Sequence, residues 1–138
     1  MIQKVFLDTN VILDFLLLRS PFTEEARELF YKKEDGEIDI YVSALSFGIA
    51  SYFIEKSKHN SSMLIAKLLR LVEVVDLTRD VVEQAVVSNF QDFEDALQYC
   101  SAKKIAGIDF LITRNKKDFK HSSIPVVTPV EFIDSFTK

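Results

Sequence analysis

Acidic side chains in this 138-residue sequence fall at positions where they could share a metal ion. Asp8 directly follows an apolar, strand-like run over residues 2–7, and Asp118 follows a second such run. Asp92 and Asp95 stand three residues apart at the start of a predicted helix, so they share one helical face. Clustered carboxylates repel each other unless a cation compensates them, and such oxygen-rich sites suit Mg²⁺ or Mn²⁺. Ions of this kind activate water and stabilise charge on a phosphodiester.

Each of these acids also has a purely structural interpretation. Asp8 suits a turn or a helix cap, Asp92 a helix cap, and Asp118 an ordinary loop. Asp95 is favoured at the start of a helix by the helix dipole. Asn10, close to Asp8, is either a neutral ligand or a capping residue. The structural interpretations weaken together, because three separate segments would bring acids to one edge of a sheet.

Other reactive residues give little support to other chemistry. Asp14 interrupts an apolar helical stretch, so it must either reach solvent or have a polar partner. Glu94 is expected to be solvated. His59 and His121 are isolated, which argues against zinc, and three glycines provide no phosphate-binding loop. Cys100 is the only cysteine, so we expect it to pack in the interior and to form no internal disulfide.

Basic residues gather near the last acid, although the net charge of the chain is −4. Arg114, Lys116 and Lys117 lie just before Asp118. They form either a solvated loop face or a patch that steers phosphate groups. Their position beside the acidic cluster favours the second interpretation, whereas the overall charge gives no support for nucleic-acid binding.

Short β-rich runs alternate with helical patterns along the whole chain. Strands are expected over residues 2–7, 38–42, 72–76, 110–112 and 124–127. Helices are expected over residues 11–18, 24–33, 44–58 and 62–71, from 78, over 92–107 and from 128, with Thr23 as a cap and Val81, Val82, Ala85 and Val86 turned inward. This alternation predicts one α/β domain with a mainly parallel sheet between helices. Ligands in such folds bind at the carboxyl ends of the strands, near a switch in strand order.

The apolar runs are too short for a membrane span, so we expect no membrane partner. The N-terminus lacks the features of a secretory signal, and one cysteine excludes an internal disulfide. A cytoplasmic location is the resulting expectation.

Three segments together resemble the PIN-domain family: residues 5–14, 92–102 and 110–119. The resemblance covers essentially the whole chain, as a single PIN-like domain over residues 1–138. It implies a three-layer α/β/α sandwich, Rossmann-like, and a ribonuclease that depends on Mg²⁺ or Mn²⁺. Many bacterial members of similar length are toxins of toxin–antitoxin pairs. The implied partners are therefore RNA, an antitoxin protein and a second copy of the chain.

The resemblance also assigns roles to residues by motif position. It implies that the core catalytic residues and metal ligands are Asp8 and Asp95, with the cluster completed by Asp118, or by Asn115 just before it. Asp92 would be a further ligand. Accessory roles would fall to Asn10, Asp14, Thr113 and Asn115, and phosphate steering to Arg114, Lys116 and Lys117.

Two positions depart from the family pattern: Ile49, and Asn115, which occupies a place often held by an aspartate. The family usually has a glutamate about six residues after Ser43, where this chain has Ile49, and Glu55 lies more than a turn further on. We therefore expect weakened metal binding and attenuated nuclease activity. A non-catalytic module that binds nucleic acid or protein is the alternative. A small-molecule phosphohydrolase on a Rossmann-like sheet is a third possibility, without an obvious nucleophile arrangement.

Overall fold

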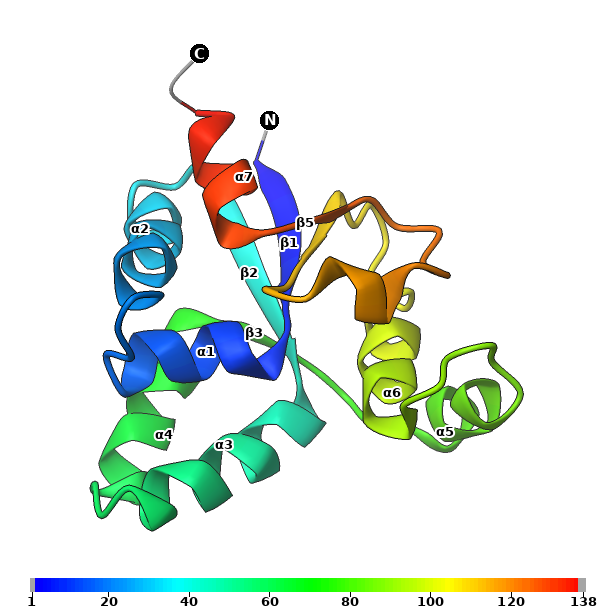
Figure 1. Cartoon of the computed structure of the whole chain (residues 1–138), viewed down its shortest axis with the longest axis horizontal. Coiled ribbons are helices and arrows are strands. Elements are labelled where there is room, and N and C mark those ends of the chain that lie inside the picture. Colours follow the sequence, from blue (N-terminus) through cyan, green and yellow to red (C-terminus); the bar gives the residue numbers. More distant parts are fainter. Residues whose placement is uncertain (1, 137–138) are drawn as a thin grey trace.

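A five-stranded parallel sheet forms the centre of the computed structural model, which describes residues 2–136 (Figure 1). The strand order is β3-β2-β1-β4-β5, and every neighbouring pair is parallel. The strands are β1 (Gln3–Leu7), β2 (Ile38–Ser43), β3 (Glu73–Val75), β4 (Phe110–Ile112) and β5 (Val126–Val127).

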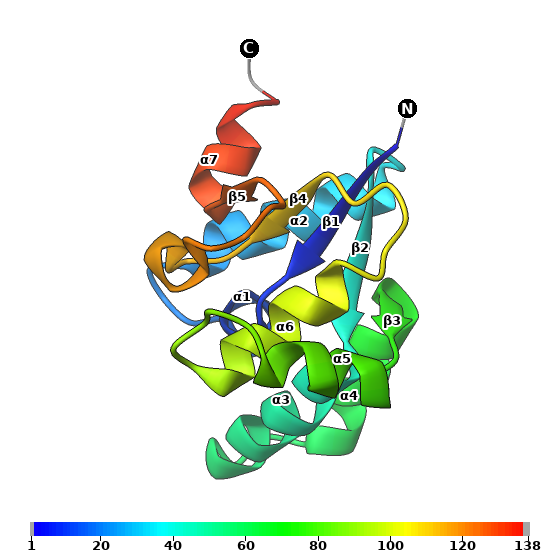
Figure 2. The ribbon, with the colours of Figure 1, turned by 90° about the vertical axis from the view of Figure 1, so that its right-hand side faces the viewer.

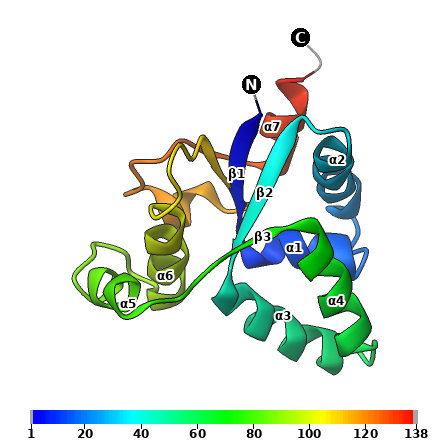
Figure 3. The ribbon, with the colours of Figure 1, turned by 180° about the vertical axis from the view of Figure 1, so that it is seen from behind.

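Helices cover both faces of this sheet, as Figures 2 and 3 show from the side and from behind. One face carries α1 (Thr9–Leu16), α2 (Thr23–Glu34), α3 (Ala44–Lys56), α4 (Ser61–Leu71) and α7 (Pro129–Asp134). The other carries α5 (Arg79–Val86) and α6 (Phe93–Ala102), with the 3₁₀ helix η1 (Lys116–Phe119) nearby. The expected three-layer α/β/α sandwich is confirmed.

Strand β1 shows how the sequence builds two cores. Val5 and Leu7 are buried in the cluster under α1 to α4, whereas Phe6 is buried among residues of α5 and α6. Successive side chains of a strand point to opposite faces, so a continuous apolar run is what a sheet covered on both sides requires.

Several element boundaries differ from the sequence expectation. Helix α6 ends at Ala102, five residues before the expected end. Gly107 instead lies in the following loop, where its positive φ of 75° allows the chain to turn. In α5, Val82 and Val86 are exposed, because burial against α6 needs only the stripe formed by Val81 and Ala85.

The expected cap of α2 is also wrong. Phe22 occupies the N-cap position without a side-chain hydrogen bond. The Thr23 hydroxyl is buried and has no hydrogen-bond partner in the part of the chain that the structure describes. By contrast, Ser43 caps α3, Asp92 caps α6 and Thr128 forms a capping box with Glu131, as their sequence positions indicate.

The strand order reverses at β1, which pairs with β2 on one side and β4 on the other. Crossovers therefore leave the sheet in opposite directions here, which opens a crevice at the carboxyl ends of β1 and β4. Asp8 follows one of these ends and Thr113 the other. No helix within residues 2–136 is long and apolar enough to cross a membrane.

Candidate active site

Asp8 is fixed at the switch point by both neighbouring elements. Its backbone N–H donates to the Ile112 carbonyl at 3.0 Å, which continues the pairing of β1 with β4. Its side chain caps α1 by accepting from the Thr9 N–H at 2.8 Å. The Thr113 hydroxyl donates to its second oxygen, also at 2.8 Å. The capping role expected from the sequence and the site role therefore belong to the same carboxylate.

Asp95 lies in the first turn of α6, on the opposite wall. Its backbone N–H donates to the Asp92 carboxylate at 3.0 Å, so Asp92 acts as the helix cap. Asp118 lies in η1, where it accepts from the Asn115 side-chain amide at 2.6 Å. Asn115 in turn donates its backbone N–H to Thr113 at 3.2 Å.

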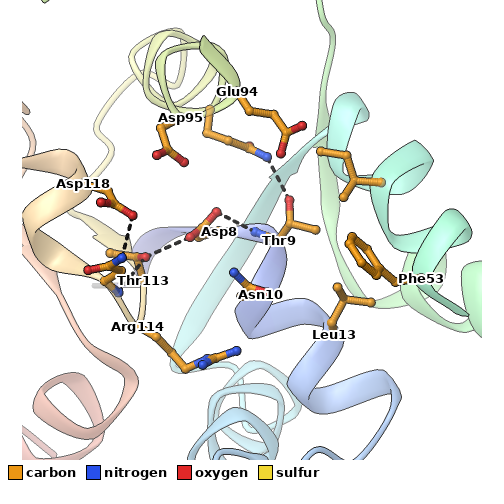
Figure 4. A pocket seen from close by; sticks show the side chains of 13 residues that line it. Asp8, Thr9, Asn10, Leu13, Phe53, Glu94, Asp95, Thr113, Arg114 and Asp118 are labelled. Atoms are coloured by element: carbon orange, nitrogen blue, oxygen red, sulfur yellow. Dashed lines mark hydrogen bonds between the residues drawn. The ribbon is translucent and has the colours of Figure 1, made fainter. Parts of the chain in front are cut away.

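A cavity of about 430 Å³ joins these segments (Figure 4). The carboxylates of Asp8, Asp95 and Asp118 line it, as the sequence predicted for one shared edge. Its other lining residues include Asn10, Thr113, Arg114, Asn115, Ile49, Phe53, Leu13 and Gln98. Glu94 is exposed, as expected from the sequence, and it also lines the cavity.

The carboxylates that line this cavity repel one another. Burial, followed by repulsion from Asp92, Asp8, Asp118 and Glu94, raises the pKa of Asp95 to about 7. Burial also raises the pKa of Asp8, and its hydrogen bonds from Thr113 and Thr9 act in the opposite direction. Repulsion between like charges at one cavity favours a bound cation that would compensate them.

Asp14 lies outside this cavity lining and belongs to an ion cluster behind it. Its side chain is 1% exposed and forms ion pairs with Arg19 at 2.9 Å and with Arg114 at 2.8 Å. Of the two alternatives left by the sequence, solvent or a polar partner, the structure has the partner. Burial raises the pKa of Asp14, and the two guanidinium groups counteract that effect.

The predicted phosphate-steering residues differ in their surroundings. Arg114 lines the cavity and stacks on the Phe22 ring, with its guanidinium carbon 3.8 Å from the ring centroid. Lys116 pairs with Glu131 of α7 at 3.1 Å, on the surface. Lys117 lines a neighbouring hollow that shares Asp95 and Asp118 with the main cavity. Arg114 is therefore the basic group built into the cavity itself.

The donor chemistry of the cavity fits a small divalent cation. Asp8, Asp95 and Asp118 offer oxygen ligands, which Mg²⁺ and Mn²⁺ prefer, and their repulsion is what such an ion would relieve. Within residues 2–136, no three carboxylate, imidazole or thiol groups stand close enough to hold a metal ion as they are placed. The fit is thus one of ligand type and charge.

Comparison with known proteins identifies this arrangement. A family model described as "PIN domain" matches residues 4–117. The chain belongs to the PIN-domain family. Asp8, Asp95 and Asp118 are thus the acids that this PIN domain gathers at the switch point of its sheet.

Similar proteins extend over nearly the whole of this PIN domain. Ribonuclease VapC1 of Aquifex aeolicus is 30% identical over 138 residues, which cover 96% of this chain and 94% of that protein. A chain of a toxin-antitoxin complex from Klebsiella pneumoniae superposes with a TM-score of 0.67 at 25% identity, covering 91% and 97% of the two chains. Mycobacterium tuberculosis VapC20, a toxin that cleaves the sarcin-ricin loop, shares the fold, with a TM-score of 0.68 at 18% identity over 85% and 94%.

A buried polar network behind this PIN-domain cavity was missed by the sequence analysis. The Gln98 side-chain amide donates to the hydroxyls of Thr9 and Ser46, both at 2.9 Å, and these two hydroxyls are 2.8 Å apart. The network joins α6, α1 and α3. Its sequence signal was the spacing of Gln98, three residues after Asp95 and therefore on the same helical face.

Proposed function

We propose that this PIN domain is an endoribonuclease that depends on Mg²⁺ or Mn²⁺. The observation that carries the proposal is the placement of Asp8, Asp95 and Asp118 around one cavity that Arg114 also lines. The name of the Aquifex relative as a ribonuclease supports the substrate class.

The metal would be held by Asp8 and Asp95, with Asp118 completing the set and Asp92 as a further ligand. When bound, Mg²⁺ or Mn²⁺ activates water and neutralises charge that develops on the phosphodiester. Thr113 and the backbone of Thr9 keep the Asp8 carboxylate oriented through two 2.8 Å hydrogen bonds. Such fixed ligands cost no reorganisation during the reaction.

The basic and amide groups would hold the RNA chain. Arg114 faces the cavity and is suited to a phosphate group because its planar fork can donate two hydrogen bonds. Lys117, beside the cavity, would steer the backbone more weakly, as would Lys116 once it exchanges Glu131 for phosphate. Asn10 and Asn115 offer polar groups at the same cavity.

The activity would be attenuated because the α3 side of the cavity is apolar. Ile49 lines the cavity at the position where the family usually has a glutamate, beside Phe53 and Leu13. This wall supplies no oxygen ligand, so a second ion has fewer groups to hold it. The same observation favours the alternative function, a non-catalytic module that binds nucleic acid or protein.

The proposed biological role is that of the toxin in a toxin–antitoxin pair, with an antitoxin protein as partner. Support comes from the Klebsiella pneumoniae chain of similar fold, which was solved in a toxin-antitoxin complex. We also propose a homodimer, for which the exposed apolar side chains of Val86, Val87 and Phe93 offer surface. Light scattering that finds a monomer at high micromolar concentration would contradict the homodimer.

Cleavage of labelled single-stranded RNA tests the proposed function. We expect weak cleavage that needs a divalent ion, is greater with Mn²⁺ than with Mg²⁺, and falls steeply with salt. Asp8→Ala should abolish it, and Ile49→Glu should increase it by restoring a carboxylate. Salt-dependent binding without cleavage would favour the binding module, whereas equal cleavage by wild type and Asp8→Ala would refute the mechanism.

A further inference from the structure

The carboxylate of Asp14 bridges two guanidinium groups behind the cavity. One oxygen accepts a hydrogen bond from Arg19 at 2.9 Å, and the other lies 2.8 Å from Nε of Arg114. Asp14 itself is 1% exposed, so no solvent is available to replace either partner. A buried carboxylate needs such compensation, and here it receives two positive charges.

Arg114 is held in place from two directions. Asp14 lies 2.8 Å from Nε and accepts a hydrogen bond from Nη2 at 3.4 Å, and the centroid of the Phe22 ring lies 3.8 Å from the guanidinium carbon. Arg114 also lines the cavity that contains Asp8, Asp95 and Asp118. A free arginine loses rotamer entropy when it is immobilised, and these contacts impose the order before any ligand arrives.

The second guanidinium supports another residue of the cavity. Arg19 donates to the backbone carbonyl of Asn10 at 3.1 Å and to its side-chain oxygen at 3.2 Å. Asn10 lines the cavity. One buried carboxylate therefore orders two cavity residues, Arg114 directly and Asn10 through Arg19.

The charges of the two walls are complementary to a phosphodiester. Asp14, Arg19 and Arg114 together carry one net positive charge, and they lie behind one wall of the cavity. The facing wall carries the carboxylates that favour a bound cation. A phosphate group between an ordered guanidinium and a cation would have both of its free oxygens compensated.

We propose that Asp14 is a positioning residue that holds Arg114, with the support of Phe22, as the group that binds the phosphodiester of single-stranded RNA. The inference rests on the proposed function for its ligand. It gives Asp14 no metal-binding role, because its two oxygens are already occupied by arginines.

Binding of single-stranded RNA to Asp14→Asn tests the proposal through the sign of the effect. The comparison is made in an Asp95→Asn background, which prevents cleavage. Removing a negative charge near bound phosphate would strengthen binding if Asp14 acted only through its charge. If it positions Arg114, binding weakens by about ten-fold, and the slope of log K against log salt falls by about 0.7, the value for one lost phosphate contact on a single strand.

Two further variants keep the test decisive. Arg114→Ala should reproduce both changes, and adding Asp14→Asn to it should weaken binding much less than Asp14→Asn does alone, since only the route through Arg19 and Asn10 is left. Phe22→Leu should weaken binding by about three-fold, since it removes the stacking surface alone. Tyr52→Leu is the matched control, because Tyr52 is an exposed aromatic over Lys56 outside the cavity lining. If Asp14→Asn does not fold, Phe22→Leu against Tyr52→Leu decides the question.

Side-chain NMR of the Arg114 Nε–Hε group tests its positioning without RNA. We expect backbone-like order in the wild type and lost order in Phe22→Leu, with the exposed Arg79 as the mobile reference. A mobile Arg114 in a protein that binds RNA would overturn the positioning role alone. No RNA binding by the parental protein would overturn the proposed function and, with it, the phosphate-binding role. Tighter or unchanged binding by a folded Asp14→Asn also overturns the proposal.

Discussion

The carboxylates of Asp14 in α1 and Asp95 in α6 have opposite electrostatic surroundings. Asp14 is almost fully buried and contacts two arginines. Asp95 is partly buried, its electrostatic neighbours are four other acids, and within residues 2–136 no ion pair involves it. Both are aspartates on helices, yet only one is compensated by the chain itself.

This difference separates a carboxylate that the chain itself compensates from the carboxylates that we propose bind a metal ion. Asp14 keeps its two arginine partners in the native state whether or not a ligand is bound. An uncompensated acid such as Asp95 costs folding free energy when it ionises, and it is retained where something outside the chain can neutralise it. Removing each type of acid should therefore change stability in opposite directions.

The largest expected effect is on the free energy of unfolding. Asp14→Ala leaves two guanidinium groups without their shared partner and should destabilise the protein by about 3 kcal/mol, toward the low end of the range because both arginines are about one-third exposed. Asp95→Asn should be neutral or stabilising. Urea unfolding in the presence of a chelator compares the two, and equal losses would remove the distinction.

A divalent cation should stabilise only those variants that keep the proposed metal ligands. An ion that binds only the native state stabilises it by about 2.7 kcal/mol at a hundred-fold excess over its Kd. We therefore expect Mn²⁺ to raise the Tm of the wild type and of Asp14→Ala alike. Asp8→Asn and Asp95→Asn should show much smaller shifts. Equal shifts in all four proteins, measured by scanning calorimetry, would exclude a shared metal site.

The smallest expected effect is on the pH dependence of stability. The pKa of Asp95 is raised in the folded state, from 3.8 to about 7, so the native protein holds this proton more tightly than the unfolded chain does. Stability is then lost as the pH rises from about 4 to about 7. Because Asp95 is partly exposed and solvent screens its neighbours, we expect a loss of about 1 kcal/mol. Unfolding of wild type and Asp95→Asn at pH 5 and pH 7.5 without metal measures it, and parallel curves would contradict the assignment.

Sequence reasoning located the main acids because their local context is informative. Asp8 ends an apolar strand, and Asp92 with Asp95 opens a helix, so the rule for parallel sheets brings them to one edge. It was less successful with the inward face of α5. That face depends on which neighbour covers the helix, and a 3.6-residue period alone does not name that neighbour.

The sequence by itself determined the alternation of strands and helices, the caps at Ser43, Asp92 and Thr128, and the order of the acidic motifs. These follow from local preferences within a few residues. Only the tertiary structure decided which acids are compensated. The contacts of Asp14 with Arg114 and of Asp8 with Thr113 span 100 and 105 residues, and they exist because β1 and β4 pair side by side. Electrostatic energy depends on distances in space and on exclusion of water, and neither is set until the sheet has formed.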